Sequence, residues 1–141
     1  MRKMTLVLLA AATAMGVACS DSNNDSVTGV NVVAVDGVYL LQSVNGKGLP
    51  YLLFQQDSTT VVATDGRLEI TTTGTWTERV TVRTVTGIDT TTETASAAGT
   101  LFRNGGTLMF VDTDGNPYYN GTATATQLNL TAGSATIVYV R

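Results

Sequence analysis

From Gly37 to the end of the chain, apolar and polar residues alternate with the two-residue period of a β-strand, and almost no stretch has a helical period. Thr, Val, Ile and Tyr dominate this part, as expected where β-branched and aromatic side chains pack on a pleated surface. The residues predicted to share a face of their strand are Leu68 with Ile70, Trp76 with Val80 and Val82, Leu128 with Leu130, and Ile137 with Tyr139. This alternation predicts antiparallel sheet with one buried and one solvated face.

Turn signals recur about every ten residues, a spacing typical of a β-sandwich or β-barrel. They are Asn45-Gly46 followed by Gly48 and Pro50, Asp65-Gly66, Thr73-Gly74, Thr86-Gly87, Asn104-Gly105-Gly106, Asp114 to Pro117, and Ala132-Gly133. The predicted strands are residues 38–44, 51–55, 59–64, 67–72, 75–85, 92–103, 107–112, 118–125, 127–131 and 135–140. About eight to ten strands are enough to close an antiparallel up-and-down β-barrel.

The first 18 residues have the layout of a secretory signal peptide. Arg2 and Lys3 form a basic tip, an apolar run extends from Met4 to Ala14, and small residues follow. The run is too short for a permanent membrane span, which needs about 20 apolar residues. We therefore expect cleavage after Ala18.

Gly16, Val17, Ala18 and Cys19 resemble the lipobox of bacterial lipoproteins, although Gly16 stands where Leu is usual. The resemblance implies that Cys19 is acylated and becomes the first residue of the mature protein. Each buried methylene group of the acyl chains adds about 0.8 kcal/mol of membrane affinity, so two or three chains anchor the protein stably. An ordinary signal peptide that ends near a Cys is the alternative.

Residues 19–35 are predicted to be the lipidated Cys and a polar tether, and residues 36–141 to be one folded domain. Ser20, next to the lipidated Cys, resembles the residue found in lipoproteins sorted to the outer membrane. The expected location is therefore the cell envelope, with the protein held by lipid on the outer membrane and facing the periplasm or the cell surface.

Charge and composition exclude several functions. The formal charge is −3, and cleavage removes two of the 8 basic side chains, so 6 remain against 11 acidic ones. This balance argues against nucleic acid as a partner. The chain has no His and a single Cys, which removes the commonest general base and zinc ligand and any disulfide within the chain. We expect a protein that is not an enzyme and has no cofactor or metal.

Residues 36–50, DGVYLLQSVNGKGLP, resemble the opening of lipocalin-like domains in small bacterial lipoproteins, with Tyr39 where the lipocalin signature has Trp. Similar pieces follow at residues 74–83, 99–115, 119–130 and 136–141. The resemblance implies a lipocalin-like barrel that binds a small apolar or amphipathic ligand.

Glu78 shares its predicted strand face with Trp76, Val80 and Val82, which would point its carboxylate into the barrel. An unpaired buried charge is costly, so such a group needs a partner or a wet cavity. Two interpretations remain open: a bulge or strand end turns Glu78 outward, or Glu78 is a ligand-facing acid in the barrel mouth. In the second case Trp76, Glu78 and Val80 are the candidate ligand-binding residues.

Other residues allow a structural and a functional interpretation. Tyr51, Tyr118, Tyr119 and Trp76 are either plain core or the lining of a pocket. The run from Asp112 to Asn116 resembles the start of a calcium loop, but position 123 is Ala where an EF-hand needs Glu, so a hairpin turn is favoured.

The functional hypothesis is a membrane-anchored envelope lipoprotein whose barrel binds a small apolar or amphipathic molecule. The alternative is a structural or adaptor lipoprotein with a filled barrel that binds another component of the envelope. An apolar hollow of ligand size would favour the first hypothesis, and a filled interior the second.

Overall fold

A computed structural model describes residues 33–141. The expected signal peptide, Cys19 and most of the tether lie outside the described residues. Within residues 33–141 no helix is long and apolar enough to span a bilayer. The ten strands are β1 (Gly37–Val44), β2 (Lys47–Gly48), β3 (Tyr51–Gln56), β4 (Thr59–Ile70), β5 (Thr75–Thr86), β6 (Asp89–Asn104), β7 (Thr107–Asp112), β8 (Pro117–Ala123), β9 (Gln127–Ala132) and β10 (Ala135–Val140).

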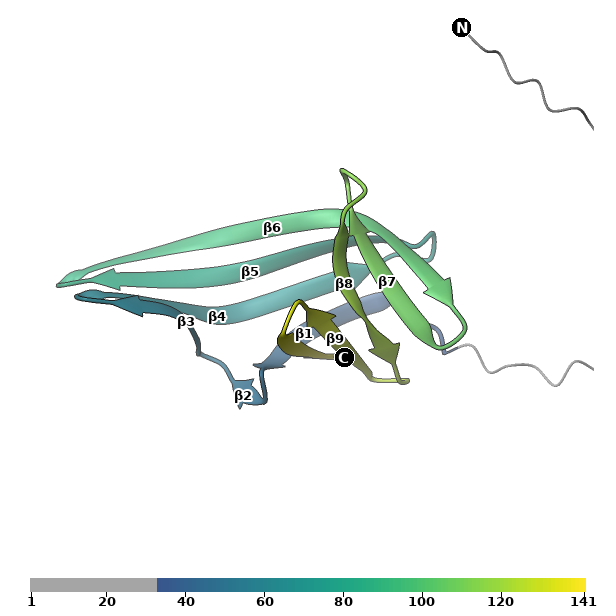
Figure 1. Cartoon of the computed structure of the whole chain (residues 1–141), viewed down its shortest axis with the longest axis horizontal. Coiled ribbons are helices and arrows are strands. Elements are labelled where there is room, and N and C mark those ends of the chain that lie inside the picture. The colour runs from purple at the N-terminus through teal and green to yellow at the C-terminus, as the bar shows by residue number, and fades with distance from the viewer. Residues whose placement is uncertain (1–32) are drawn as a thin grey trace, which may run out of the picture. The chain divides into compact units, whose positions relative to one another are not determined.

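The strands form one antiparallel sheet that closes into an eight-stranded barrel, which confirms the predicted fold class (Figure 1). Strands β4 to β9 each pair with the next strand in the sequence, as in an up-and-down barrel. Closure comes from β1, which pairs with β10 on one side and with β4 on the other. Strand β2 is an addition to the edge of β1 that was not predicted.

The segment 59–70 was predicted as two strands separated by an Asp65-Gly66 turn, and this prediction was wrong. The chain continues as a single strand, β4, with a register shift between Ala63 and Asp65 opposite β5. Gly66 lies on the inner face, and a Cβ atom there would lie 2.7 Å from Cβ of Leu41. A Gly within a strand often marks a bulge or a close approach, and here it marks both.

Several predicted hairpin turns are confirmed where glycine or asparagine adopts a positive φ. Asn45 and Gly46 have φ of 51° and 72° and join β1 to β2. Gly87, Gly105 and Gly133 have φ of 61°, 59° and 58° and join β5 to β6, β6 to β7 and β9 to β10. A φ in this range costs Gly little and suits the tight turn of a hairpin.

Strands β3 to β6 extend beyond the barrel as a four-stranded sheet, which we call the arm (residues 51–63 and 82–93; Figure 1). Strand β4 pairs with β3 in its first half and with β1 in its second half. Strand β6 pairs with β5 along its whole length but with β7 only from Gly99 onward. The arm therefore continues the barrel wall on one side of the open end.

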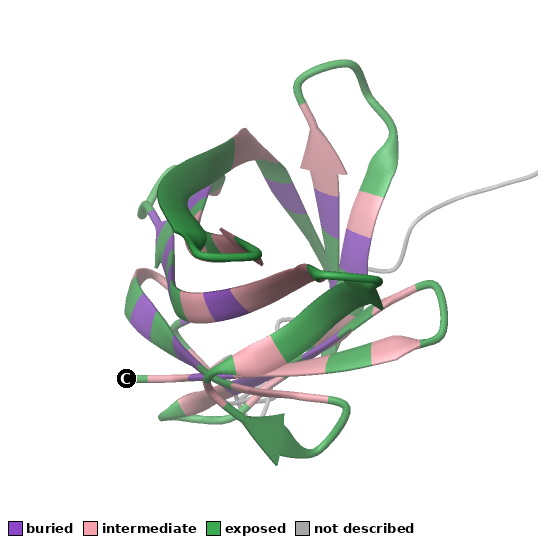
Figure 2. Ribbon diagram, turned by 90° about the vertical axis from the view of Figure 1, so that its left-hand side faces the viewer, coloured by how far each residue is buried: buried purple, intermediate pink, exposed green. Residues whose placement is uncertain are grey.

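The core fills the other end of the barrel. Buried and exposed residues alternate along its strands (Figure 2). The largest fully buried side chains are Trp76, Tyr39, Tyr139, Phe110, Leu68, Leu108, Leu128 and Leu130. The inner face of β6 carries Gly99 and Ala97 opposite Trp76 and Glu78 of β5, so the small residues leave room for the large ones.

The chain just before β1 packs against this filled end. Val35 is buried, and its carbonyl accepts a hydrogen bond from the Tyr39 hydroxyl at 3.0 Å. Arg141 donates to the carbonyls of Ala34 and Asp36 and lies over the Tyr39 ring, 5.3 Å from its centroid. The folded unit thus includes residues 33–35, which were predicted to belong to the tether.

Trp76 provides a test of the face assignment. It is 1% exposed, lies edge-on to Phe110, and donates its indole N–H to the Val111 carbonyl at 3.2 Å. We expect Trp76→Ala to lower the free energy of unfolding by about 3 to 5 kcal/mol, because it removes a large buried aromatic side chain and leaves a cavity.

Chemical denaturation would measure this loss, with the native emission of Trp76 expected to be blue-shifted and to move red on unfolding. Phe102→Ala is the control, because Phe102 is half exposed on the outer face of β6, and it should cost under about 1 kcal/mol. Equal effects of the two substitutions would contradict the assigned faces.

Candidate functional site

Glu78 is the one charged side chain buried in the barrel among residues 33–141, at 3% exposure. It lies on the inner face of β5, between Leu68 of β4 and Ala97 of β6. The interpretation that a bulge turns Glu78 outward was wrong, because the register shift falls in β4 and β5 remains regular around residue 78. The alternation along β5 therefore carries the carboxylate into the interior.

Three tyrosine hydroxyl groups donate hydrogen bonds to the Glu78 carboxylate. Tyr118 donates to Oε2 at 3.0 Å, and Tyr119 lies 2.8 Å from Oε1 and 3.1 Å from Oε2. Tyr139 makes a short hydrogen bond to Oε1. Two donors come from β8 and one from β10, so the cluster joins three strands of the barrel. We call these four residues the Glu78 cluster.

The buried carboxylate depends on these donors. Each hydrogen bond to a charged group contributes about 1.5 to 3 kcal/mol, and an unpartnered charge in the interior costs several kcal/mol. Burial, and then the nearby Glu78 charge, raise the pKa of Tyr118 to about 12. The same two causes raise the pKa values of Tyr119 and Tyr139 further above the ordinary value for tyrosine. All three hydroxyls therefore keep their protons, and remain donors, at neutral pH.

An apolar hollow of about 270 Å³ opens on one side of the cluster. Its polar floor is formed by Glu78, Tyr119 and Tyr139. Its other lining residues are mostly apolar and come from β1, β3, β4, β5 and β10: Leu41, Val44, Asn45, Tyr51, Leu53, Ala63, Val80, Ala135 and Ile137. The hollow thus combines apolar walls with a few polar groups that converge at one end, as ligand sites do.

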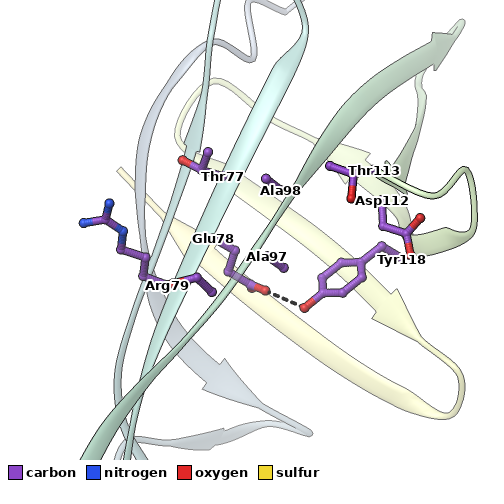
Figure 3. A pocket seen from close by; sticks show the side chains of 9 residues that line it. Thr77, Glu78, Arg79, Ala97, Ala98, Asp112, Thr113 and Tyr118 are labelled. Atoms are coloured by element: carbon purple, nitrogen blue, oxygen red, sulfur yellow. Dashed lines mark hydrogen bonds between the residues drawn. The ribbon is translucent and has the colours of Figure 1, made fainter.

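A second, more polar groove lies on the other side of Glu78 and measures about 460 Å³. In Figure 3 the Tyr118 ring points its hydroxyl at the Glu78 carboxylate, with Asp112 and Thr113 near the base of that ring. The groove passes beside β6 where this strand has not yet paired with β7. Glu78 lines both spaces.

Of the three predicted ligand-binding residues, two line the hollow and one does not. Glu78 and Val80 line the hollow, with Val80 between Gly66 and Ala95 on the neighbouring strands. Trp76 does not line it and belongs to the packed end of the barrel.

The aromatic residues divide between core and pocket. Tyr51 lines the hollow and Tyr118 lines the groove, whereas Tyr119 contributes to both the core and the hollow. Tyr139 was predicted only as a face residue of β10. Its role as a donor to Glu78 was missed, because no local signal links residues 61 positions apart.

The segment from Asp112 to Asn116 is a hairpin turn between β7 and β8, as the favoured interpretation predicted. Oδ1 of Asp112 accepts hydrogen bonds from the backbone N–H groups of Asp114 at 2.9 Å and Asn116 at 2.8 Å. These bonds, led by the one from Asn116, lower the pKa of Asp112 below its ordinary value. The Asp112 carboxylate thus stabilises the turn itself.

Comparisons with family models, with curated proteins and with solved structures find no match for the chain. The function must therefore be inferred from the site itself.

The tyrosines of the Glu78 cluster predict a loss of stability at alkaline pH. The folded state raises the pKa of Tyr118 from 10.0 to about 12, so it holds this proton more tightly than the unfolded chain. This stabilisation is fully present below about pH 10 and is lost as the pH rises toward about 12. Tyr119 and Tyr139, whose pKa values are raised further, add to the loss.

Denaturation midpoints measured between about pH 9 and pH 12 should therefore fall with pH. Tyr118→Phe removes one titrating group and should make the decline shallower. An unchanged slope in this variant would show that Tyr118 is not coupled to folding.

Proposed function

We propose that this chain is a non-catalytic envelope lipoprotein, anchored in the membrane through acyl chains on Cys19, whose barrel binds a small apolar or amphipathic molecule. The observation that carries the binding proposal is the apolar hollow of about 270 Å³ at the open end of the barrel. An eight-stranded barrel is wide enough either to be filled by side chains or to hold one small ligand. This barrel is filled at the Trp76 end and hollow at the Val80 end.

The size and lining of the hollow define the ligand class. Ligand pockets usually measure roughly 300 to 1,000 Å³, so a hollow of about 270 Å³ suits a small molecule or one end of a longer one. Leu53 of β3 lines the hollow and is half exposed, as is Phe54, the next residue of β3, so an apolar chain can continue along the arm. A polar group on the ligand would meet the Glu78 cluster.

The anchoring part of the proposal is supported by the sequence of residues 1–19. The basic tip, the apolar run and the small residues before Cys19 together resemble a lipoprotein signal. Cys19 is also the only Cys in the chain, so its thiol has no partner for a disulfide within it. The chain has no His, which supports a role without acid–base or nucleophilic catalysis.

The arm supports the second candidate, an adaptor function. Within the described part of the chain, residues 33–141, no strand pairs with one edge of β3 or with the edge of β6 before Gly99. An open strand edge can pair with an extended segment of another protein. The adaptor function would leave the hollow without a ligand, so experiments on the hollow separate the two candidates.

Blocking the hollow should abolish binding of a small amphipathic probe. We expect 1-octanol to shift the amide resonances of Leu41, Val80 and Ile137, which line the hollow. Val80→Phe should remove this response, because the larger ring occupies the space above Gly66 and Ala95.

Val85→Phe is the matched control. Residue 85 lies on the same strand but on the opposite face and does not line the hollow. If octanol produced the same shifts in the Val80→Phe protein, or none in the unmodified protein, ligand binding in the hollow would be excluded.

Cys19→Ser tests the anchor. The substitution removes the thiol that would be acylated, so we expect an unprocessed or soluble product that takes up no labelled palmitate. Metabolic labelling and membrane fractionation of cells that express either form would measure this. Palmitate incorporation that persisted in the Ser variant would contradict acylation at residue 19.

A further inference from the structure

We propose that the hollow selects a cationic amphiphile, whose primary or secondary ammonium group binds at the Glu78 cluster and whose apolar chain fills the hollow. This inference rests on the proposed ligand-binding function and adds the chemistry of the ligand's polar end. It follows from the hydrogen-bond donors, the charges and the apolar lining of the site.

The floor of the hollow has acceptors but no free donor. Each tyrosine hydroxyl carries one hydrogen, and Tyr118, Tyr119 and Tyr139 all direct theirs at the Glu78 carboxylate. The four contacts that these hydroxyls make, two of them from Tyr119, approach both carboxylate oxygens twice, so the free acceptors are the lone pairs of the tyrosine oxygens. A ligand group that donates hydrogen bonds therefore fits this floor, whereas a carboxylate or phosphate does not.

The charge at the floor is also negative. Among residues 33–141 the single ion pair joins Arg67 and Glu69, which are half exposed, and no Lys or Arg pairs with Glu78. The charges that raise the pKa of Tyr139 include Glu78 and Asp65, both acidic. A cation in the hollow would neutralise a buried charge for which residues 33–141 provide no counter-ion.

The walls provide the remaining selectivity. Val80, Ile137 and Leu41 offer an apolar surface for an aliphatic chain. The rings of Tyr119 and Tyr139 also line the hollow, and aromatic rings attract cations. An inorganic cation would gain nothing from the aliphatic part of these walls, so the site suits an ammonium group attached to an apolar chain.

Three probes with the same chain and different head groups test the proposal: hexylamine, 1-hexanol and hexanoate. The full-length lipidated protein would be placed in nanodiscs of neutral phosphatidylcholine, and binding would be measured by equilibrium dialysis with empty nanodiscs as the blank. We expect hexylamine to bind at least about tenfold more tightly than hexanol, as a charge-assisted hydrogen bond should give. Hexanoate should show no specific binding.

The outcomes separate this proposal from the proposed function. Equal binding of hexanol and hexylamine would overturn the ammonium site and leave an apolar ligand site. Preferential binding of hexanoate would also overturn it. If none of the three probes bound above the blank, both the ligand-binding function and this inference would fail.

Substitutions test whether Glu78 causes the preference for hexylamine over hexanol. In Glu78→Gln, which removes the charge at nearly constant shape, the ratio of hexylamine to hexanol affinity should fall to about one. If this variant does not fold, Val80→Lys provides the second test, because its own ammonium group would lie next to Glu78 on the same strand face. Val80→Lys should lose the amine preference, and Val80→Met, of similar length without charge, should keep it. A preference that survives either Glu78→Gln or Val80→Lys overturns the proposal.

Discussion

A carboxylate placed inside a barrel must be hydrogen-bonded, and in this protein that requirement ties together strands that are distant in sequence. Glu78 of β5 is held by Tyr118 and Tyr119 of β8 and by Tyr139 of β10. Desolvation makes an unpartnered charge costly, so the cluster fixes how these strands face one another across the interior. Its polar atoms also mark where the packed core ends and the hollow begins.

The arm exists because three strands of the barrel are much longer than the others. Strands β4, β5 and β6 have 12, 12 and 16 residues, whereas β7 to β10 have 6 or 7. The short strands can close the barrel along only part of the length of the long strands, so the rest of the long strands projects beyond the closed sheet. Because the inner face of β5 continues from Val80 to Val82 into the arm, the hollow opens onto a half-exposed apolar surface instead of ending at a rim.

Much of the barrel wall was predictable because its signals are local. Alternation assigned Leu68, Ile70, Leu128 and Leu130 to the inner face, and all four are buried. The Asn45-Gly46 turn has the positive φ angles that these residues tolerate at low cost. Asp65-Gly66 looks the same in sequence but lies within β4, because the pairing with β5 and the contact with Leu41 outweigh the turn preference. Such contacts depend on residues far away in the chain.

The candidate site shows the same division between local and tertiary information. The sequence by itself determined that the chain forms antiparallel sheet, that Glu78 shares a strand face with Trp76 and Val80, and that the chain has no histidine and no second cysteine for an internal disulfide. Only the tertiary structure decided that Glu78 points inward with three tyrosines around it, that Trp76 packs in the core while Val80 lines a hollow, and that β1 closes the barrel against β4. The physical reason is the distance along the chain over which each signal acts. Periodicity and turn chemistry depend on residues only a few positions apart. The partners of a buried charge depend instead on which strands face one another once the barrel has closed.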